Sequence, residues 1–132
     1  MERHDINPWE WSKSESVGFS QAVDLRGAEQ VVFCAGQTAI GSDGSPPADT
    51  TMGAQLRKAF DSLSAVLEAA GLGLGAVVRL NIYTTDVDEF FTVYPAIRSE
   101  VMGANMPAMT LLGITRLAFP MLKVELEATA VR

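Results

Sequence analysis

Cysteine and histidine are almost absent from this sequence, which argues against two kinds of site. Cys34 is the single cysteine, so no disulfide can form within the chain. His4 is the single histidine, and a transition-metal site needs several such ligands. Cys34 lies in an apolar segment without a histidine or basic helix near it in the sequence, so we interpret it as a core residue and not as a nucleophile. We therefore expect no bound metal.

Long apolar runs and nucleotide-binding glycine motifs are also missing. No segment has the pattern of a signal peptide or of a membrane span, so we expect a cytoplasmic protein that does not contact membranes. The glycine-rich run at 71–75 follows a predicted helix instead of opening one. It therefore indicates a linker and not a phosphate-binding loop, and we expect no cofactor.

Positive charge is scarce. The chain has 10 Lys and Arg against 16 Asp and Glu, a formal net charge of −6. Broad binding to a phosphate backbone needs a basic surface, so nucleic acid is not an expected partner, whereas a small acidic ligand in a local pocket is compatible with this charge. Charged residues make up only 20%, below the roughly 25% of typical globular chains. Either the chain is an alanine- and leucine-rich monomer, or it has apolar surface that a subunit interface covers.

The length of 132 residues fits one domain. We predict a single domain over 1–132 with an N-terminal arm over 1–16. Trp9 and Trp11 stand in this arm. They either fasten the arm to the body or line the mouth of a cleft, where they would help to select an aromatic or apolar ligand.

Five strands are predicted from hydrophobic patterning. The first two, at 20–25 and 30–35, are joined by a short turn and form a hairpin. Because the second of them is continuously apolar, both its faces should be covered. Alternation of apolar and polar residues predicts further strands at 78–83 and 123–131, and 109–114 is another strand candidate.

A first helix is predicted from apolar residues at three- and four-residue steps, namely Met52, Leu56, Ala59, Phe60, Leu63, Val66, Leu67 and Ala70. Its N-terminus should be capped by Asp49, Thr50 or Thr51. Gly71 fits the position after the helix, which favours a left-handed backbone.

A second helix is predicted between the third and fourth strands. Asp86 and Glu89 resemble a capping box. Pro95 lacks a backbone donor, so we expect a short turn and then a helix that starts near Pro95. The resulting order, β-β-α-β-α-β-β, predicts an α+β fold in which both helices pack on one face of a mixed sheet.

The other face of the sheet is then uncovered. The last strand should present Glu125, Glu127 and Thr129 on it. Such a face either lies in water or packs against other subunits around polar pockets.

Segments spread over the chain from Val17 onward resemble the Rid family (RidA, YjgF or L-PSP proteins) in their order and spacing. They are 18–23 (GFSQAV), 33–37 (FCAGQ), 63–71 (LSAVLEAAG), 80–91 and 123–131 (KVELEATAV). The resemblance implies a fold like that of trimeric chorismate mutase and a homotrimer with a ligand pocket at each cleft between subunits. The best-known activity of the family is the hydrolysis of reactive imines and enamines, such as 2-aminoacrylate, to a keto acid and ammonia. Other members are described as binding proteins, translation inhibitors or ribonucleases.

Two positions bear on catalysis by resemblance. In deaminating members an arginine after Pro-Ala holds the substrate carboxylate, and here that position is Met109, which cannot bind an anion. Arg116 lies roughly 23 Å further along an extended chain, and Arg79 and Arg98 lie elsewhere, so only an arginine of a neighbouring subunit could replace it. In deaminating members a glutamate positions or activates the attacking water, and the matching residue here is Glu125. Alternatively, Glu125 is a solvated strand residue or a partner in an intersubunit ion pair.

The remaining pocket positions are less polar than in the family. A tyrosine becomes Phe19, a serine becomes Ala35, and a pocket asparagine aligns with Tyr94. Gly36 is kept, and without a Cβ its backbone could approach a ligand closely or form a turn. These changes favour a less polar ligand.

Three functions remain open from the sequence. The first is a Rid-like trimer that binds a small metabolite and hydrolyses or tautomerises an imine or enamine with help from Glu125. The second is a trimer that binds or senses a small molecule without catalysis. The third, a ribonuclease or translation inhibitor, is disfavoured by the net charge of −6.

Overall fold

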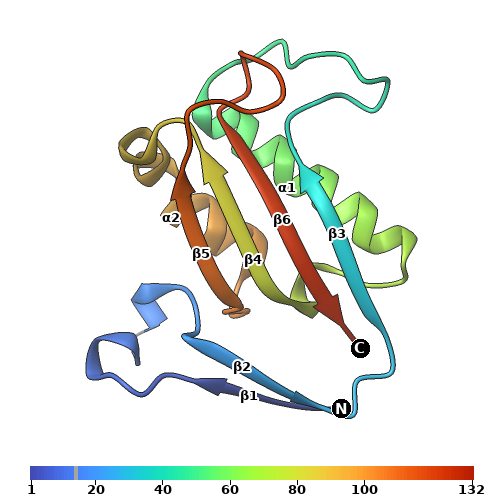
Figure 1. The fold of residues 1–132 in the computed structure, drawn as a ribbon, viewed down its shortest axis with the longest axis vertical. Coiled ribbons are helices and arrows are strands. Elements are labelled where there is room, and N and C mark those ends of the chain that lie inside the picture. Colours follow the sequence, from blue (N-terminus) through green and yellow to red (C-terminus); the bar gives the residue numbers. More distant parts are fainter. Residues whose placement is uncertain (14) are drawn as a thin grey trace.

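The structure is a computed structural model that describes residues 1–13 and 15–132, and a four-stranded sheet backed by two helices dominates it (Figure 1). The strands and helices are β1 (Glu2–Ile6), β2 (Ala22–Arg26), β3 (Val31–Gln37), α1 (Met52–Ala69), β4 (Val77–Thr84), α2 (Val87–Met102), β5 (Ala108–Gly113) and β6 (Val124–Val131). Short 3-10 helices occur at Glu10–Ser12, Glu15–Val17 and Leu74–Ala76. Among the described residues, no helix is long and apolar enough to cross a membrane.

The predicted α+β fold is confirmed. The strand order is β3-β6-β4-β5, in which β4 and β5 are parallel and the other neighbours are antiparallel. Both helices lie on one face of this sheet, behind it in the view of Figure 1. One strand, β1, precedes the seven predicted elements.

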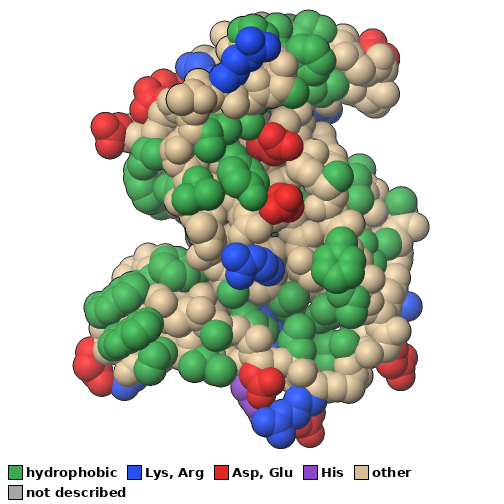
Figure 2. All heavy atoms as spheres, in the orientation of Figure 1, with side chains coloured by type: hydrophobic (Ala, Val, Ile, Leu, Met, Phe, Trp, Pro, Cys, Tyr) green, Lys and Arg blue, Asp and Glu red, His purple; other side chains and the backbone are tan. Residues whose placement is uncertain are grey.

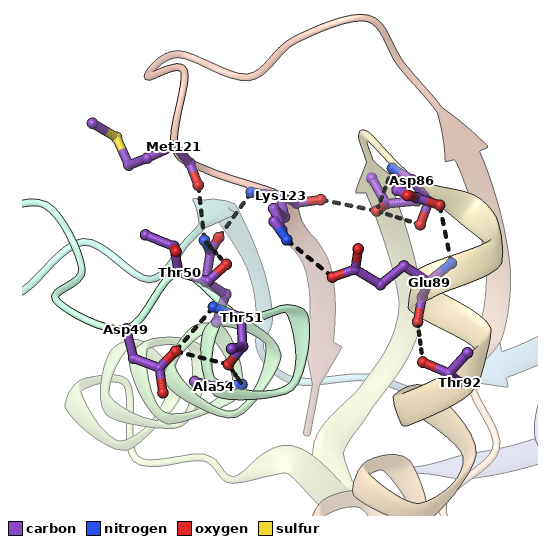
Figure 3. Close-up of polar contacts among 11 residues, drawn as sticks. Asp49, Thr50, Thr51, Ala54, Asp86, Glu89, Thr92, Met121 and Lys123 are labelled. Carbon is purple, nitrogen blue, oxygen red and sulfur yellow. Dashed lines mark hydrogen bonds and ion pairs between the residues drawn. The ribbon is translucent and has the colours of Figure 1, made fainter.

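Helix α1 forms for the reasons that the sequence indicates. Most of its predicted stripe is fully buried, including Leu56, Phe60 and Leu63. Thr51 is the N-cap and accepts a hydrogen bond from the Ala54 N–H at 3.4 Å (Figure 3). Gly71 has a φ of +76° after the last turn, as predicted.

Helix α2 begins earlier than predicted. It runs without interruption from Val87 to Met102, so the expected start near Pro95 is wrong. Asp86 caps the helix by accepting from the Glu89 N–H at 3.0 Å, while the Glu89 carboxylate accepts from Lys123 Nζ at 3.0 Å and does not complete a capping box (Figure 3). Pro95 is tolerated inside the helix because it is exposed, so the carbonyl that loses its helical donor, that of Phe91, lies on an exposed side.

The predicted N-terminal hairpin is also wrong. Strand β2 pairs antiparallel with β1, not with β3, and β3 pairs with β6. The pair β1–β2 lies below the main sheet in Figure 1. Arg3 on β1 binds the body, because its Nη1 donates to Asn105 Oδ1 at 2.8 Å and its Nη2 to the Met106 carbonyl at 3.2 Å.

Within one protomer, strand β3 is covered on one face only, so a single chain does not cover both faces as the sequence predicts. Cys34 points into the core, as predicted, and burial raises the pKa of its thiol. Its neighbour Phe33 points away from the helices and is 81% exposed. Figure 2 shows this uncovered face, where acidic and basic side chains lie among hydrophobic ones.

One buried polar side chain connects α1 to the segment before β6. Gln55 has no exposed surface. Its Nε2 donates to the Met121 carbonyl at 2.8 Å and its Oε1 accepts from the Lys123 N–H at 2.8 Å. These bonds fix the start of β6 relative to the first turn of α1.

Replacing Gln55 by leucine should lower the free energy of unfolding by about 3 kcal/mol, because a buried carbonyl and a buried N–H would lose their partner. Urea denaturation would measure the loss. As a control on the exposed side of the same helix, Lys58→Leu should change stability by less than about 0.5 kcal/mol. Equal stability of the two variants would contradict this role of Gln55.

Candidate functional site

Three of the predicted binding residues meet at one cavity. Phe19, Tyr94 and Met109 line a hollow of about 180 Å³ between the segment before β2, helix α2 and strand β5. They come together because Ser20 is bonded to the start of β5: its N–H donates to the Pro107 carbonyl at 3.0 Å. The other lining residues are all apolar, namely Val17, Phe90, Phe91 and Leu111.

Tyr94 is the polar group of this cavity. Its ring stacks on Phe90 with the centroids 4.7 Å apart, and its hydroxyl donates to Met109 Sδ at 3.1 Å. Burial raises the pKa of Tyr94 to about 12, so the phenol is protonated at neutral pH. Because a thioether is a weak acceptor, this hydroxyl can turn to a ligand at little cost.

Gly36 and Glu125 form a second group, on the uncovered face of the sheet. A Cβ on Gly36 would collide with the Glu125 carboxyl group, whose carbon would lie 2.6 Å from it. Gly36 therefore makes room for this side chain, and its neighbour Ala35 is exposed. Neither Gly36 nor Glu125 lines the cavity of Met109 in the same protomer.

The two acids of β6 have opposite environments. Removal of water by burial, followed by the charge of Glu127, raises the pKa of Glu125. Glu127 accepts from Asn81 Nδ2 at 2.8 Å and from the Tyr83 hydroxyl at 3.0 Å, and these bonds lower its pKa. A carboxyl group that holds its proton more tightly beside one that stays ionised is suited to proton transfer.

Sequence reasoning missed Asn81 and Tyr83. They lie on β4, opposite Glu127 and Glu125 respectively in the antiparallel register with β6. The alternation of polar residues in β4 could have indicated them, because polar residues on the uncovered face of one strand lie beside those on the uncovered face of the next strand.

The tryptophans of the arm lie outside both groups. Trp9 and Trp11 stack on each other with their centroids 6.0 Å apart, and they are 53% and 59% exposed. Neither lines the cavity of Met109 within one protomer.

Comparison with known proteins identifies the family of this chain. The family model described as Endoribonuclease L-PSP matches residues 13–132. A 2-iminobutanoate/2-iminopropanoate deaminase of Escherichia coli (strain K12) is 35% identical over 118 residues, which cover 86% of this chain and 87% of that protein. A crystal structure of YyfB from Yersinia pestis, a Rid-family protein of unknown function, superimposes with a TM-score of 0.87 at 31% identity over 100% of both chains. The chain belongs to the Rid family.

The N-terminal arm is shared with some Rid proteins. The family model begins at residue 13, after β1. The similarity to YyfB nevertheless covers the whole chain, and that to Rv2704 from Mycobacterium tuberculosis covers 99% of it, at 32% identity and a TM-score of 0.66. Strand β1 of this Rid-family chain therefore lies within a region that these structures also have.

The opposite pKa shifts of Glu125 and Glu127 predict opposite effects of pH on the stability of their variants. The raised pKa of Glu125 means that its contribution to stability is present below its ordinary value of 4.5 and is lost as pH rises through the folded value. Glu125→Gln should thus gain stability relative to the wild type between roughly pH 4 and pH 7. The lowered pKa of Glu127 acts in reverse, because its contribution is present above 4.5 and lost on acidification, so Glu127→Gln should lose stability over the same range.

Thermal unfolding of both variants and the wild type across this pH range would measure the two slopes. Changes of the same sign in the two variants would contradict the assignment of a proton-holding role to Glu125 alone.

Proposed function

We propose that this Rid-family chain forms a homotrimer through the uncovered face of its sheet, and that each cleft between protomers is a ligand site. In each cleft the cavity of Met109 from one protomer would meet the Gly36–Glu125 pair of its neighbour. The observation that carries the proposal is the separation of these two groups within a protomer. The cavity has an apolar wall and no acid or base, whereas Glu125 has the proton-transfer chemistry and lies on an open surface.

The exposed apolar side chains of the sheet face support the assembly. Phe33 is 81% exposed, and Val31 on the same strand is 50% exposed. Burying a phenylalanine side chain is worth roughly 1.5–3 kcal/mol, and a trimer would bury three copies of each residue.

The proposed reaction is hydrolysis of an imine to a carbonyl compound and ammonia. Water adds to the carbon of the C=N bond, and Glu125 takes a proton from the water as the new C–O bond forms. The same carboxyl group returns this proton to the nitrogen, which gives a carbinolamine. It then takes the proton of the new hydroxyl group as the C=O bond forms, and it passes this proton to the nitrogen as the C–N bond breaks and ammonia leaves. A raised pKa suits both steps, because the group must accept a proton and release it near neutral pH.

A second candidate, binding of a small molecule without catalysis, is favoured by one contact. The Tyr94 hydroxyl donates to Met109 Sδ, at the position where deaminating relatives are expected to hold the substrate with arginine. A pocket without that arginine could still bind a ligand but no longer catalyse its reaction.

The assembly can be tested by changing one exposed side chain. Phe33→Glu places a charge in the proposed interface and should shift the protein from a trimer, with three times the chain mass of 14.2 kDa, to a monomer. Sedimentation velocity would measure the mass. Val66→Glu, on the outer side of α1 and 37% exposed, is the matched control and should remain a trimer. A wild type that is monomeric at working concentrations would overturn the proposal.

The chemistry can be tested by ammonia release from 2-iminopropionate and from bulkier or uncharged imines. Glu125→Gln should lower kcat by about 10²- to 10⁴-fold on the preferred substrate. Met109→Arg should raise kcat/KM for 2-iminopropionate by about ten- to a hundredfold, because it supplies a charged hydrogen bond to the carboxylate. If the wild type releases no more ammonia than Glu125→Gln from any substrate while a ligand still binds saturably, the non-catalytic candidate replaces the catalytic one.

A further inference from the structure

A second hollow adjoins the cavity of Met109. Its volume is about 350 Å³, and Arg98 from α2 supplies its positive charge. Val17, Phe91 and Tyr94 line both hollows, so they form a shared wall between them. A ligand that lies along this wall would contact Met109 at one end and Arg98 at the other.

The guanidinium of Arg98 is held in place by backbone carbonyls. Its Nε donates to the Gly18 carbonyl at 2.8 Å and its Nη2 to the Asn105 carbonyl at 3.0 Å. Gly18 has a φ of +81°, and a Cβ there would lie 3.1 Å from Arg98 Nε. Only glycine combines this backbone conformation with room for the arginine.

No acidic side chain in the described part of the protomer pairs with the charge of Arg98. Among the side chains that the structure describes, Arg98 forms no ion pair, whereas Arg57 on α1 binds Glu100 at 2.7 Å. Within residues 1–13 and 15–132, two of the five N–H groups of Arg98 have acceptors among the described groups, and both acceptors are neutral carbonyls. The remaining donors are suited to a carboxylate, which guanidinium binds with two parallel hydrogen bonds.

We propose that Arg98, and not position 109, anchors the carboxylate of the ligand. The ligand would be a carboxylic acid with an aromatic or branched apolar body, which lies across Tyr94 and ends against Phe19 and Met109. Tyr94 and Arg98 are four residues apart, roughly 6 Å along α2, so several carbon atoms would separate the acid group from the end of the body. This inference rests on the proposed function, because it takes the cavity of Met109 as part of the ligand site.

Calorimetric titration with 4-phenylbutanoate and with the matched neutral 4-phenylbutanamide tests the anchor. The wild type should bind the acid roughly ten- to a hundredfold more tightly than the amide. Arg98→Gln should remove this preference. Because Arg98 also bonds Gly18 and Asn105, Arg98→Lys is a second variant that keeps the charge and should keep part of the preference, and the exposed Arg116→Gln is a control that should keep all of it.

The outcomes separate this inference from the proposed function. No measurable binding of the acid by the wild type, equal binding of acid and amide, or a preference that survives in Arg98→Gln would overturn the anchor. A preference that depends on Arg98 supports the anchor even if no imine is hydrolysed, and then only the catalytic proposal fails. Hydrolysis of uncharged imines without any preference for an acid would keep the catalytic proposal and reject the anchor.

Discussion

The placement of both helices on one face of the sheet is the constraint from which the other features of this protein follow. Side chains of a strand alternate between faces, so alternate residues of β4 and β6, and Cys34 of β3, are buried under α1 and α2 while most of their neighbours are left uncovered. The uncovered set includes the most exposed phenylalanine of the chain, Phe33, and both acids of β6. The low content of charged residues in the sequence reflects this sheet, of which the helices cover only one face.

On the uncovered face the two acids of β6 also have different neighbours. Glu127 receives two hydrogen bonds from β4 and is held ionised, whereas Glu125 lies over Gly36, where no side chain competes for the space and none donates to it among the described residues. Two residues of the same type, two positions apart on one strand, therefore have pKa values shifted in opposite directions. The difference comes from their neighbours on the adjoining strands and not from the strand that carries them.

Periodicity in the sequence predicted the helices and strands that bury one side only. It failed for elements whose position depends on contacts between residues distant in the sequence. Helix α1 and strands β4 and β6 follow from periodicity, and Asp86 from its capping geometry. Strand β1 has the polar sequence ERHDI and no apolar alternation, and it forms by pairing with β2 and by the bonds of Arg3. Phe19, Tyr94 and Met109 can be grouped only through family resemblance. That resemblance does not include Arg98, although its four-residue spacing from Tyr94 places both on one side of a helix.

Asn105 links these distant parts. Its side chain accepts from Arg3 and donates to the carbonyls of Leu74 and Val77, while its own carbonyl accepts from Arg98. The wall of the candidate site therefore depends on the segment before β5. Hydrogen bonds to the arm hold this segment on one side, and hydrogen bonds to the start of β4 hold it on the other. Met109 and Arg98 border cavities that Tyr94 separates, so this wall retains a fixed positive charge although position 109 is apolar. In the proposed site an acidic group would therefore bind near Arg98, where the wall is charged, and not near the apolar residue 109.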